Sequence, residues 1–414
     1  MPPDMITPSG LAPRVSSHRR IRWAAGTILL GSLGSYLVVL PVFRGTLQEY
    51  YGVETEGFGL LLSIGMIPGA LAALAAGAMI QRRGARSVLR VSLLGLGGGM
   101  LLAAVAARWT VMLVAVAAMA CFAGPLHIAV QSYLANLFPR RRRRVLSMHL
   151  VAASAVGALY PLWAEWLLSL QASHPSVRFA HVLHVPFVAL AVVAVLGGLL
   201  YVRRKSLARP QPPAAPPSRW HWAKLSRAGV VLVVLMVLHG TCDTAIYFWM
   251  PKVLDGESFS RHLLRPGVVV ACYLLAYALS RALLALLPER TGRRAMLVVP
   301  GLLGGGLFLA GILSRTQVLT GIAWILGAFV WSVEYPVMMA WMAEKEGRRF
   351  GAGMAMCSVG AGVATFALMN LMGWMGGAIG EERLWTILLI PAAGYPLVGI
   401  GGAIWVWRFG RDGG

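Results

Sequence analysis

Apolar runs long enough to cross a membrane recur along the whole chain. Twelve can be placed and are numbered here as spans 1 to 12: residues 23–43, 57–80, 88–107, 109–138, 145–170, 180–202, 228–251, 264–287, 295–314, 317–343, 350–378 and 384–407. A helix needs about 20 residues to cross the hydrocarbon layer, and it satisfies its own backbone hydrogen bonds where lipid cannot. The pattern therefore predicts an all-α integral membrane protein with twelve transmembrane helices.

The cations are distributed unevenly between the two sides that these spans define. The net charge is +22, and with the amino terminus inside, 28 of the 37 Lys and Arg residues fall in cytoplasmic segments. This excess is the positive-inside pattern. The arginine run at residues 140–144 is flanked by apolar spans, so we expect it to contact anionic lipid headgroups rather than nucleic acid. We expect a multi-pass protein of the plasma membrane, in bacteria the inner membrane, with both termini cytoplasmic.

Polar segments divide the chain into equal halves. The longest internal one, residues 203–227, contains a proline-rich stretch that favours an extended linker. We expect a six-helix bundle on each side of it, residues 22–202 and 228–408. Residues 1–21 and 409–414 are then cytoplasmic tails, and we expect a monomer.

A short turn segment occurs in both halves at the same place in the hydropathy pattern. Its two copies, residues 77–86 and 285–294, are 208 residues apart, and each follows the second span of its half. A glycine triplet at residues 97–99 recurs at 304–306, at nearly the same offset. These matches predict two six-span halves related by a parallel repeat, an arrangement typical of membrane transporters.

The repeated turn resembles the pattern Gly-x-Leu-x-Asp-Arg-x-Gly-Arg-Arg that follows span 2 in the major facilitator superfamily. The resemblance covers the entire chain and implies the major facilitator fold, with the turn as a gating motif. In the first copy Gln81 stands where the family has an acid and Ala85 where it has a base, so the latch is expected mainly at Glu289. The matching residues are Gly77, Gln81, Arg82, Gly84 and Arg86, and then Glu289, Arg290, Gly292, Arg293 and Arg294.

A narrower resemblance begins at span 4. Residues 135–139, 146–149 and 157–161 look like the fucose-permease-like branch, whose members carry sugars with protons. Aligned in this way, His127 falls where that branch has a proton-carrying acid, and Gln131 falls where it has an amide that contacts sugar. Span 1 contains no carboxylate, which departs from the branch.

Few ionisable side chains lie inside the spans, and each costs about 2.5–3.5 kcal/mol there unless it finds a partner or a wet cavity. The candidates for a functional role fall on spans 4, 7 and 10, which by the resemblance are among the spans that line the central cavity in the superfamily. The helical period places them in stripes that we expect to bind substrate. The stripes are His127 and Gln131, then His239, Asp243 and Tyr247, and then Trp331, Glu334 and Tyr335.

Depth separates the two acids. At 1.5 Å per residue, Asp243 lies roughly 6 Å outside the midplane and Glu334 roughly 6 Å inside it, so no direct pairing is expected. Glu334 either forms an ion pair with Arg281 of span 8 or contacts substrate, and both alternatives stay open. Asp243 has no cation at its depth except His239, which favours a functional role. Asp243, Glu334 and His127 are the candidates for proton coupling.

The leading hypothesis is a secondary active transporter that moves a small solute by alternating access, such as a sugar-like or other polar solute, coupled to protons. Abundant Met and Trp in spans 10 and 11 support an alternative, the export of lipophilic or drug-like compounds. A transport-inactive scaffold or membrane enzyme is a third hypothesis. The histidines and cysteines lack the spacing of metal or acyl-transfer sites, and no Walker-type loop is present, so no cofactor, metal or enzymatic activity is expected.

Overall fold

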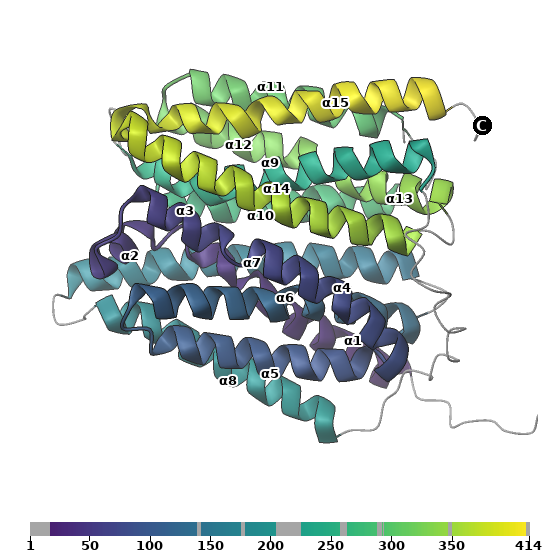
Figure 1. Cartoon of the computed structure of the whole chain (residues 1–414), viewed down its shortest axis with the longest axis horizontal. Helices are drawn as coiled ribbons and strands as arrows, with labels where there is room; N and C mark the ends of the chain where they lie inside the picture. The colour runs from purple at the N-terminus through teal and green to yellow at the C-terminus, as the bar shows by residue number, and fades with distance from the viewer. Residues whose placement is uncertain are drawn as a thin grey trace, which may run out of the picture.

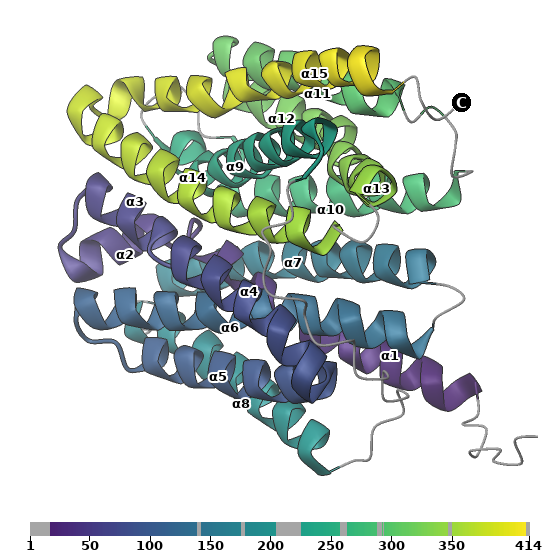
Figure 2. The same cartoon turned by 45° about the vertical axis from the view of Figure 1, so that its right-hand side comes forward.

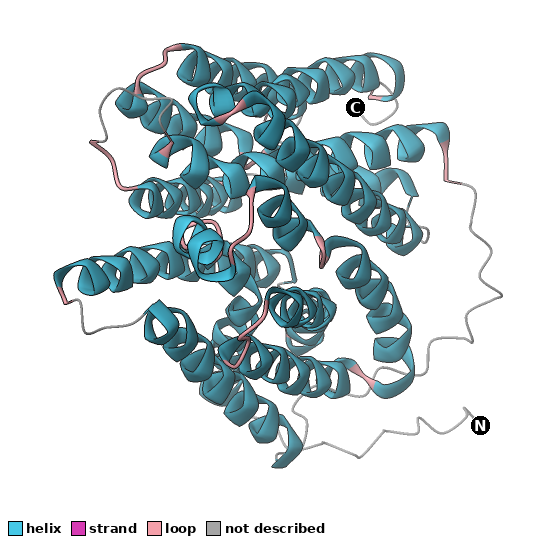
Figure 3. Cartoon of the chain, turned by 60° about the vertical axis from the view of Figure 1, so that its left-hand side comes forward, coloured by secondary structure: helices cyan, strands magenta, loops and turns pink. Residues whose placement is uncertain are grey.

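The structure is a computed structural model, and it describes residues 17–138, 142–174, 179–203, 225–256, 263–287, 292, 294–346 and 350–410. Within these ranges the chain is helical and contains no strand (Figure 3). The helices of the first half are α1 (Ser17–Gly31), η1 (Ser32–Val39), α2 (Arg44–Tyr51), α3 (Thr55–Ser63), α4 (Met66–Arg83), α5 (Ala85–Ala104), α6 (Trp109–Leu137), α7 (Arg142–Ser173) and α8 (Phe179–Arg203). Those of the second half are α9 (Arg227–Asp255), α10 (Pro266–Leu286), α11 (Ala295–Leu313), α12 (Gln317–Trp331), α13 (Glu334–Glu346), α14 (Phe350–Ile379), η3 (Glu381–Leu388) and α15 (Leu389–Phe409).

The described helices reproduce the predicted spans. Eleven segments are long and apolar enough to cross a membrane, and α8 supplies a further apolar stretch, His184–Leu200. Many leucine and valine side chains on these helices are exposed, as lipid-facing positions require. The predicted all-α membrane fold is therefore confirmed.

The helices form two bundles, α1 to α8 below and α9 to α15 above in Figure 1. In the first, α5 packs on α6 and α8, and in the second α11 packs correspondingly on α12 and α15. The bundles meet where α7 packs on α10 and where α14 packs on α3 and α4 (Figures 1 and 2). We call the end where α1 begins and α15 ends the terminal end, and the opposite end, where α2 and η3 lie, the α2 end.

The repeated turn has the same backbone requirement in both halves. Gly84 has φ 80° and Gly292 has φ 61°, and these two residues are 208 positions apart. Positive φ is a conformation that glycine adopts without the steric cost of a Cβ atom. The glycine that marks each copy of the motif is therefore explained by the turn itself.

Two predicted spans are interrupted rather than continuous. Span 2 breaks between α3 and α4 at Ile64 and Gly65, and span 10 breaks between α12 and α13 at Ser332 and Val333. A proline lies four residues after the first break residue in each case, Pro68 after Ile64 and Pro336 after Ser332. Proline donates no backbone hydrogen bond to the carbonyl four residues earlier, and its ring displaces that carbonyl. Each break therefore lies where a helix hydrogen bond is lost to proline.

Candidate functional site

The two central helices of the second bundle meet at a buried imidazole and carboxylate. The Nδ1 atom of His239 on α9 lies 3.1 Å from Oε2 of Glu334, the first residue of α13. His239 is 2% exposed and Glu334 is fully buried. The Trp331 indole stacks on the imidazole with ring centroids 4.0 Å apart and planes 9° apart. Because the break in span 10 lies between Trp331 and Glu334, the ring and the carboxylate approach His239 from two separate helices.

Two buried oxygens at this break have no hydrogen-bond partner among the described residues. They are Oε1 of Glu334 and the hydroxyl of Ser332. Buried polar atoms in proteins are nearly always paired, so unpaired atoms call for a reason. Here they lie at an interrupted helix next to an ionisable pair, where a proton, water or solute can supply the missing partner.

Asp243 lies one turn beyond His239 on α9 but faces a different helix. Its Oδ1 accepts hydrogen bonds from the hydroxyls of Tyr273, at 2.8 Å, and Tyr277 on α10. The two phenol rings stack with centroids 5.1 Å apart. Two hydroxyl donors on one oxygen fix the position of the Asp243 carboxyl group against α10. Sequence reasoning found the acid but missed the tyrosines, which occupy one face of span 8 at a spacing of four.

Arg281 links the two bundles. Its Nε donates to the Ser332 carbonyl at 3.5 Å, and a terminal nitrogen donates to the Ser154 hydroxyl on α7 at 3.4 Å. The guanidinium also lies 4.7 Å from the centroid of the Tyr277 ring. Of the two roles predicted for Glu334, the ion pair with Arg281 does not form in this structure, because Glu334 faces His239 instead.

The first bundle contains a second polar group. His127 Nε2 lies 2.8 Å from the amide nitrogen of Gln131, and His127 Nδ1 lies 3.2 Å from Nε2 of His149 on α7. The structure therefore brings together the predicted pair and adds His149, which is fully buried. No spacing rule points to His149, because it belongs to another span.

The remaining predicted aromatic residues contribute less directly. The Tyr335 ring lies 5.6 Å from the His239 imidazole, tilted by 37°. Tyr247 stacks on its neighbour Phe248 with centroids 4.5 Å apart. Tyr335 thus belongs to the surroundings of the His239 and Glu334 pair, whereas Tyr247 packs on Phe248.

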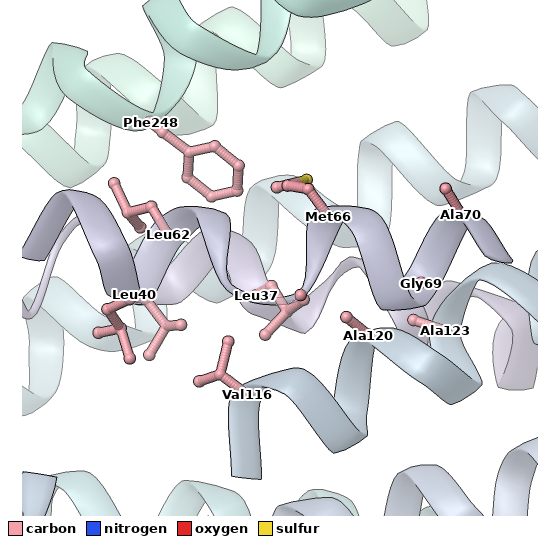
Figure 4. A pocket seen from close by; sticks show the side chains of 12 residues that line it. Leu37, Leu40, Leu62, Met66, Gly69, Ala70, Val116, Ala120, Ala123 and Phe248 are labelled. Atoms are coloured by element: carbon pink, nitrogen blue, oxygen red, sulfur yellow. The ribbon is translucent and has the colours of Figure 1, made fainter. Parts of the chain in front are cut away.

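An apolar cavity of about 220 Å³ lies between η1, α3, α4 and α6 of the first bundle and α9 of the second. Phe248 reaches toward it from α9 (Figure 4). It opens beside the break in span 2, and Gly65 and Gly69 form part of its wall. All twelve lining residues are apolar or glycine: Leu37, Leu40, Leu61, Leu62, Gly65, Met66, Gly69, Ala70, Val116, Ala120, Ala123 and Phe248.

Polar contacts between the bundles lie in the half of the molecule nearer the α2 end. Lys252 Nζ donates to the Thr55 hydroxyl at 2.5 Å, and the backbone N–H of Gly267 donates to Glu165 at 2.6 Å. Deeper in the bundle, Asn370 donates to the Ser63 hydroxyl at 2.8 Å. Nearer the terminal end, Arg281 of α10 donates to the Ser154 hydroxyl of α7 across the same interface. Three polar contacts therefore join the bundles toward the α2 end of the described residues.

The gating residues are described only in part. Gly77 has open space around its Cβ position, Arg82 and Gly84 are exposed, and Arg86 is half-buried. In the second copy, Arg294 donates to the carbonyl of Gly410 at 2.9 Å and Gly292 makes the turn. The remaining gating positions lie outside the described residues, and so does the latch expected at Glu289. They are Glu289, Arg290, Arg293 and the Gln81 side chain.

Comparison with known proteins decides the family. The model of the major facilitator superfamily matches residues 23–265, more than half of the chain. The chain belongs to the major facilitator superfamily. It is a multi-pass membrane protein with the transporter fold of that family, and no curated protein matches it in sequence.

Solved structures agree in fold across nearly the whole chain. The xylose transporter of E. coli in an inward-open conformation has a TM-score of 0.72 at 14% identity, covering 94% of this chain and 96% of that one. The fucose:proton symporter of E. coli has a TM-score of 0.66 at 17% identity, covering 93% and 99%. A bacterial homologue of the human lysosomal transporter Spinster, inward-facing and occupied, has a TM-score of 0.69 at 13% identity, covering 96% and 98%.

Proposed function

We propose that this member of the major facilitator superfamily is a secondary active transporter that moves a small polar solute by alternating access. The observation that carries the proposal is the buried pair of His239 and Glu334 at an interrupted span. Intramembrane ionisable groups are costly, and they mark solute and proton pathways in transporters. The other polar groups, at His127 on α6 and Asp243 on α9, also lie on helices that face the interface between the bundles.

Proton coupling is assigned to Glu334 with His239. A buried carboxylate and a buried imidazole that lie side by side can share one proton. Gain or loss of that proton changes the charge at the bundle interface. Pro336 leaves the Ser332 carbonyl outside the helix hydrogen bonding, so α12 and α13 can change their angle more easily than an unbroken helix can. Asp243 and His127 are the further candidates for coupling.

The distribution of charge supports an orientation of the protein in the membrane, and the contacts between bundles support a conformational state. We assign the terminal end to the cytoplasm of the plasma membrane, in bacteria the inner membrane, because Arg82 and Arg83 at the end of α4 and Arg408 at the end of α15 lie there. Since the contacts between bundles lie toward the α2 end, the conformation is then inward-facing. We further infer a monomer whose domains are the two bundles at residues 22–202 and 228–408. The side chains of the arginine run at residues 140–144 lie outside the described residues, and their contact with anionic headgroups stays a prediction from the sequence.

The solute class is supported by resemblance alone. In the fucose-permease-like alignment, Gln131 takes the place of an amide that contacts sugar and His127 takes the place of a proton-carrying acid. Two of the structures with this fold are those of a xylose transporter and a fucose:proton symporter. A sugar-like or other polar solute fits hydrogen-bonding groups such as Gln131 and the nearby histidines.

The test measures proton movement directly. Proteoliposomes loaded with pyranine are given L-fucose, D-xylose and a panel of small polar solutes, and internal pH is followed. An active solute should acidify the lumen, and Glu334→Gln should abolish acidification, with Asp243→Asn reducing its pH dependence. Exposed Glu344 and Asp255 on the same two helices supply the controls, Glu344→Gln and Asp255→Asn. If Glu334→Gln and Asp243→Asn both keep full pH dependence, the coupling assignment is wrong.

A second candidate function is favoured by the apolar cavity. Its volume and its lining without charged or polar side chains suit a lipophilic compound rather than a sugar. Efflux of a lipophilic dye from proteoliposomes separates the two functions. Val116→Trp should fill the cavity and slow dye efflux while leaving transport of a polar solute unchanged. If no solute or dye moves in any of these assays, a transport-inactive scaffold or a membrane enzyme is the better interpretation.

A further inference from the structure

Arg281 is a cation whose hydrogen-bond partners among the described residues are neutral groups. Its two hydrogen bonds go to neutral oxygens, the Ser332 carbonyl and the Ser154 hydroxyl, at 3.5 and 3.4 Å. These distances are at the long end for N–H to oxygen bonds. A guanidinium has five N–H donors, and in the described part of the chain it pairs with no carboxylate. Several of its donors are therefore available.

The two acids nearest in the fold are already engaged with other groups. Asp243 accepts from the hydroxyls of Tyr273 and Tyr277. Glu334 faces His239. The Tyr277 ring stands between Arg281 and Asp243, because it donates to the acid and lies under the guanidinium. The structure thus holds the cation apart from both carboxylates rather than pairing it with one of them.

The guanidinium faces the space between the bundles and not the lipid. Leu275, Leu279 and Leu283 form the exposed face of α10. Arg281 follows Tyr277 by four residues and so belongs to the opposite, inward face. It is partly exposed there, and its contact with Ser154 crosses to the first bundle.

We propose that the transported solute bears an oxyanion, a carboxylate or a phosphate, and that Arg281 binds it together with the Ser154 hydroxyl. This inference rests on the proposed transport function and names its substrate class. Arginine matches the geometry of carboxylate and phosphate through two parallel N–H bonds. An anion at this position neutralises a cation that is otherwise costly inside a membrane.

The position of the site gives binding a mechanical consequence. Ser154 belongs to α7, Arg281 to α10, and the Ser332 carbonyl to the break in span 10. A solute held by Arg281 and Ser154 therefore joins the two bundles on the side nearer the terminal end. Symport of one monovalent anion with one proton moves no net charge, so a membrane potential should not change its rate.

Binding is tested on purified full-length protein in detergent, without any need for transport. Benzoate and inorganic phosphate are titrated in a thermal-shift assay at constant ionic strength, with benzamide as the neutral isostere of benzoate. We expect at least one of the two anions to raise Tm saturably and benzamide to have no effect. A ligand that binds only the folded state raises apparent stability in this way. If neither anion raises Tm saturably, or if benzamide raises it as much as benzoate, the inference is wrong.

Variants then locate the site. Arg281→Gln should raise the half-saturating anion concentration on the order of thirtyfold, the scale of losing a buried charged partner. Arg281→Lys keeps the charge and should lose less, and Ser154→Ala should weaken binding to a smaller degree. Arg265→Gln, an exposed arginine at the start of the same helix, is the control. Unchanged anion binding in both Arg281 variants overturns the proposal, and folding of each variant is checked by gel filtration.

Failure of this inference is distinguishable from failure of the proposed function. Proton-coupled uptake of a neutral sugar without saturable anion binding leaves the transport proposal standing and removes the anion site. Saturable anion binding that depends on Arg281, without any solute-driven proton movement in liposomes, leaves the anion site standing and removes the proposal of proton-coupled transport.

Discussion

The Nδ1 atom of His239 and the Oε2 atom of Glu334 lie 3.1 Å apart, although 95 residues separate them in the chain. Each sits on a different central helix of the second bundle, and both are buried. Their separation depends on the angle between α9 and α13, and α13 begins directly after a helix break. A change of protonation at this pair is therefore coupled to the geometry of span 10.

Removing the imidazole should destabilise the protein. His239→Ala leaves the Glu334 carboxyl buried without its partner, which costs about 1–3 kcal/mol for an unsatisfied polar group. Denaturation in mixed micelles measures the free energy of unfolding. His174→Ala, on an exposed histidine at the end of α7, serves as the control and should change little. Equal stability of the two variants would contradict the pairing.

Removing a phenol hydroxyl from α10 should act through Asp243. Tyr273→Phe deletes one of two donors to Oδ1, at a cost of about 1.5–3 kcal/mol if the carboxylate is ionised. In a double-mutant cycle, Tyr273→Phe should cost less in the Asp243→Asn background, because the charged acceptor is already absent. If the two substitutions have additive effects on the free energy of unfolding, this interpretation is wrong.

Restoring span 10 as a continuous helix should stabilise the protein and slow its conformational change. Pro336→Ala returns a backbone N–H that can donate to the Ser332 carbonyl, and proline in a helix interior costs about 3 kcal/mol. We expect a higher Tm together with slower solute-driven proton uptake. Pro186→Ala, within the continuous helix α8, is the matched control. A transport rate unaffected by Pro336→Ala would argue against a hinge at this break.

Adding a side chain at Gly59 should push the bundles apart at the α2 end. A Cβ atom there would lie 3.0 Å from the Met369 carbonyl oxygen and 3.1 Å from the Gly373 Cα atom, both on α14. Gly59→Val should shift the population toward conformations open at this end, seen as a longer distance between spin labels on exposed Glu54 and Glu382 in a cysteine-free background. Gly98→Val, where a Cβ meets nothing within 4 Å, should leave the distance unchanged.

The sequence was informative wherever a feature is local. Long apolar runs predicted the spans to within a few residues. The motif glycines Gly84 and Gly292 are required by the turn itself. Proline content did not predict the helix breaks, because Pro125 and Pro161 lie within continuous helices whereas Pro68 and Pro336 follow interruptions. At the break in span 10, Arg281 donates to the displaced Ser332 carbonyl, and spacing along one span does not encode such a contact.

The sequence by itself determined the class of molecule: apolar runs and the cost of unpaired backbone groups in lipid leave few alternatives to a bundle of membrane helices. It also placed the ionisable residues on the central spans, since helical period is a local property. Only the tertiary structure decided their partners. It places Glu334 beside His239, Asp243 beside two tyrosines and His127 beside His149. Those choices depend on helix rotation and crossing within about an ångström, and residue spacing along one helix does not encode the position of another.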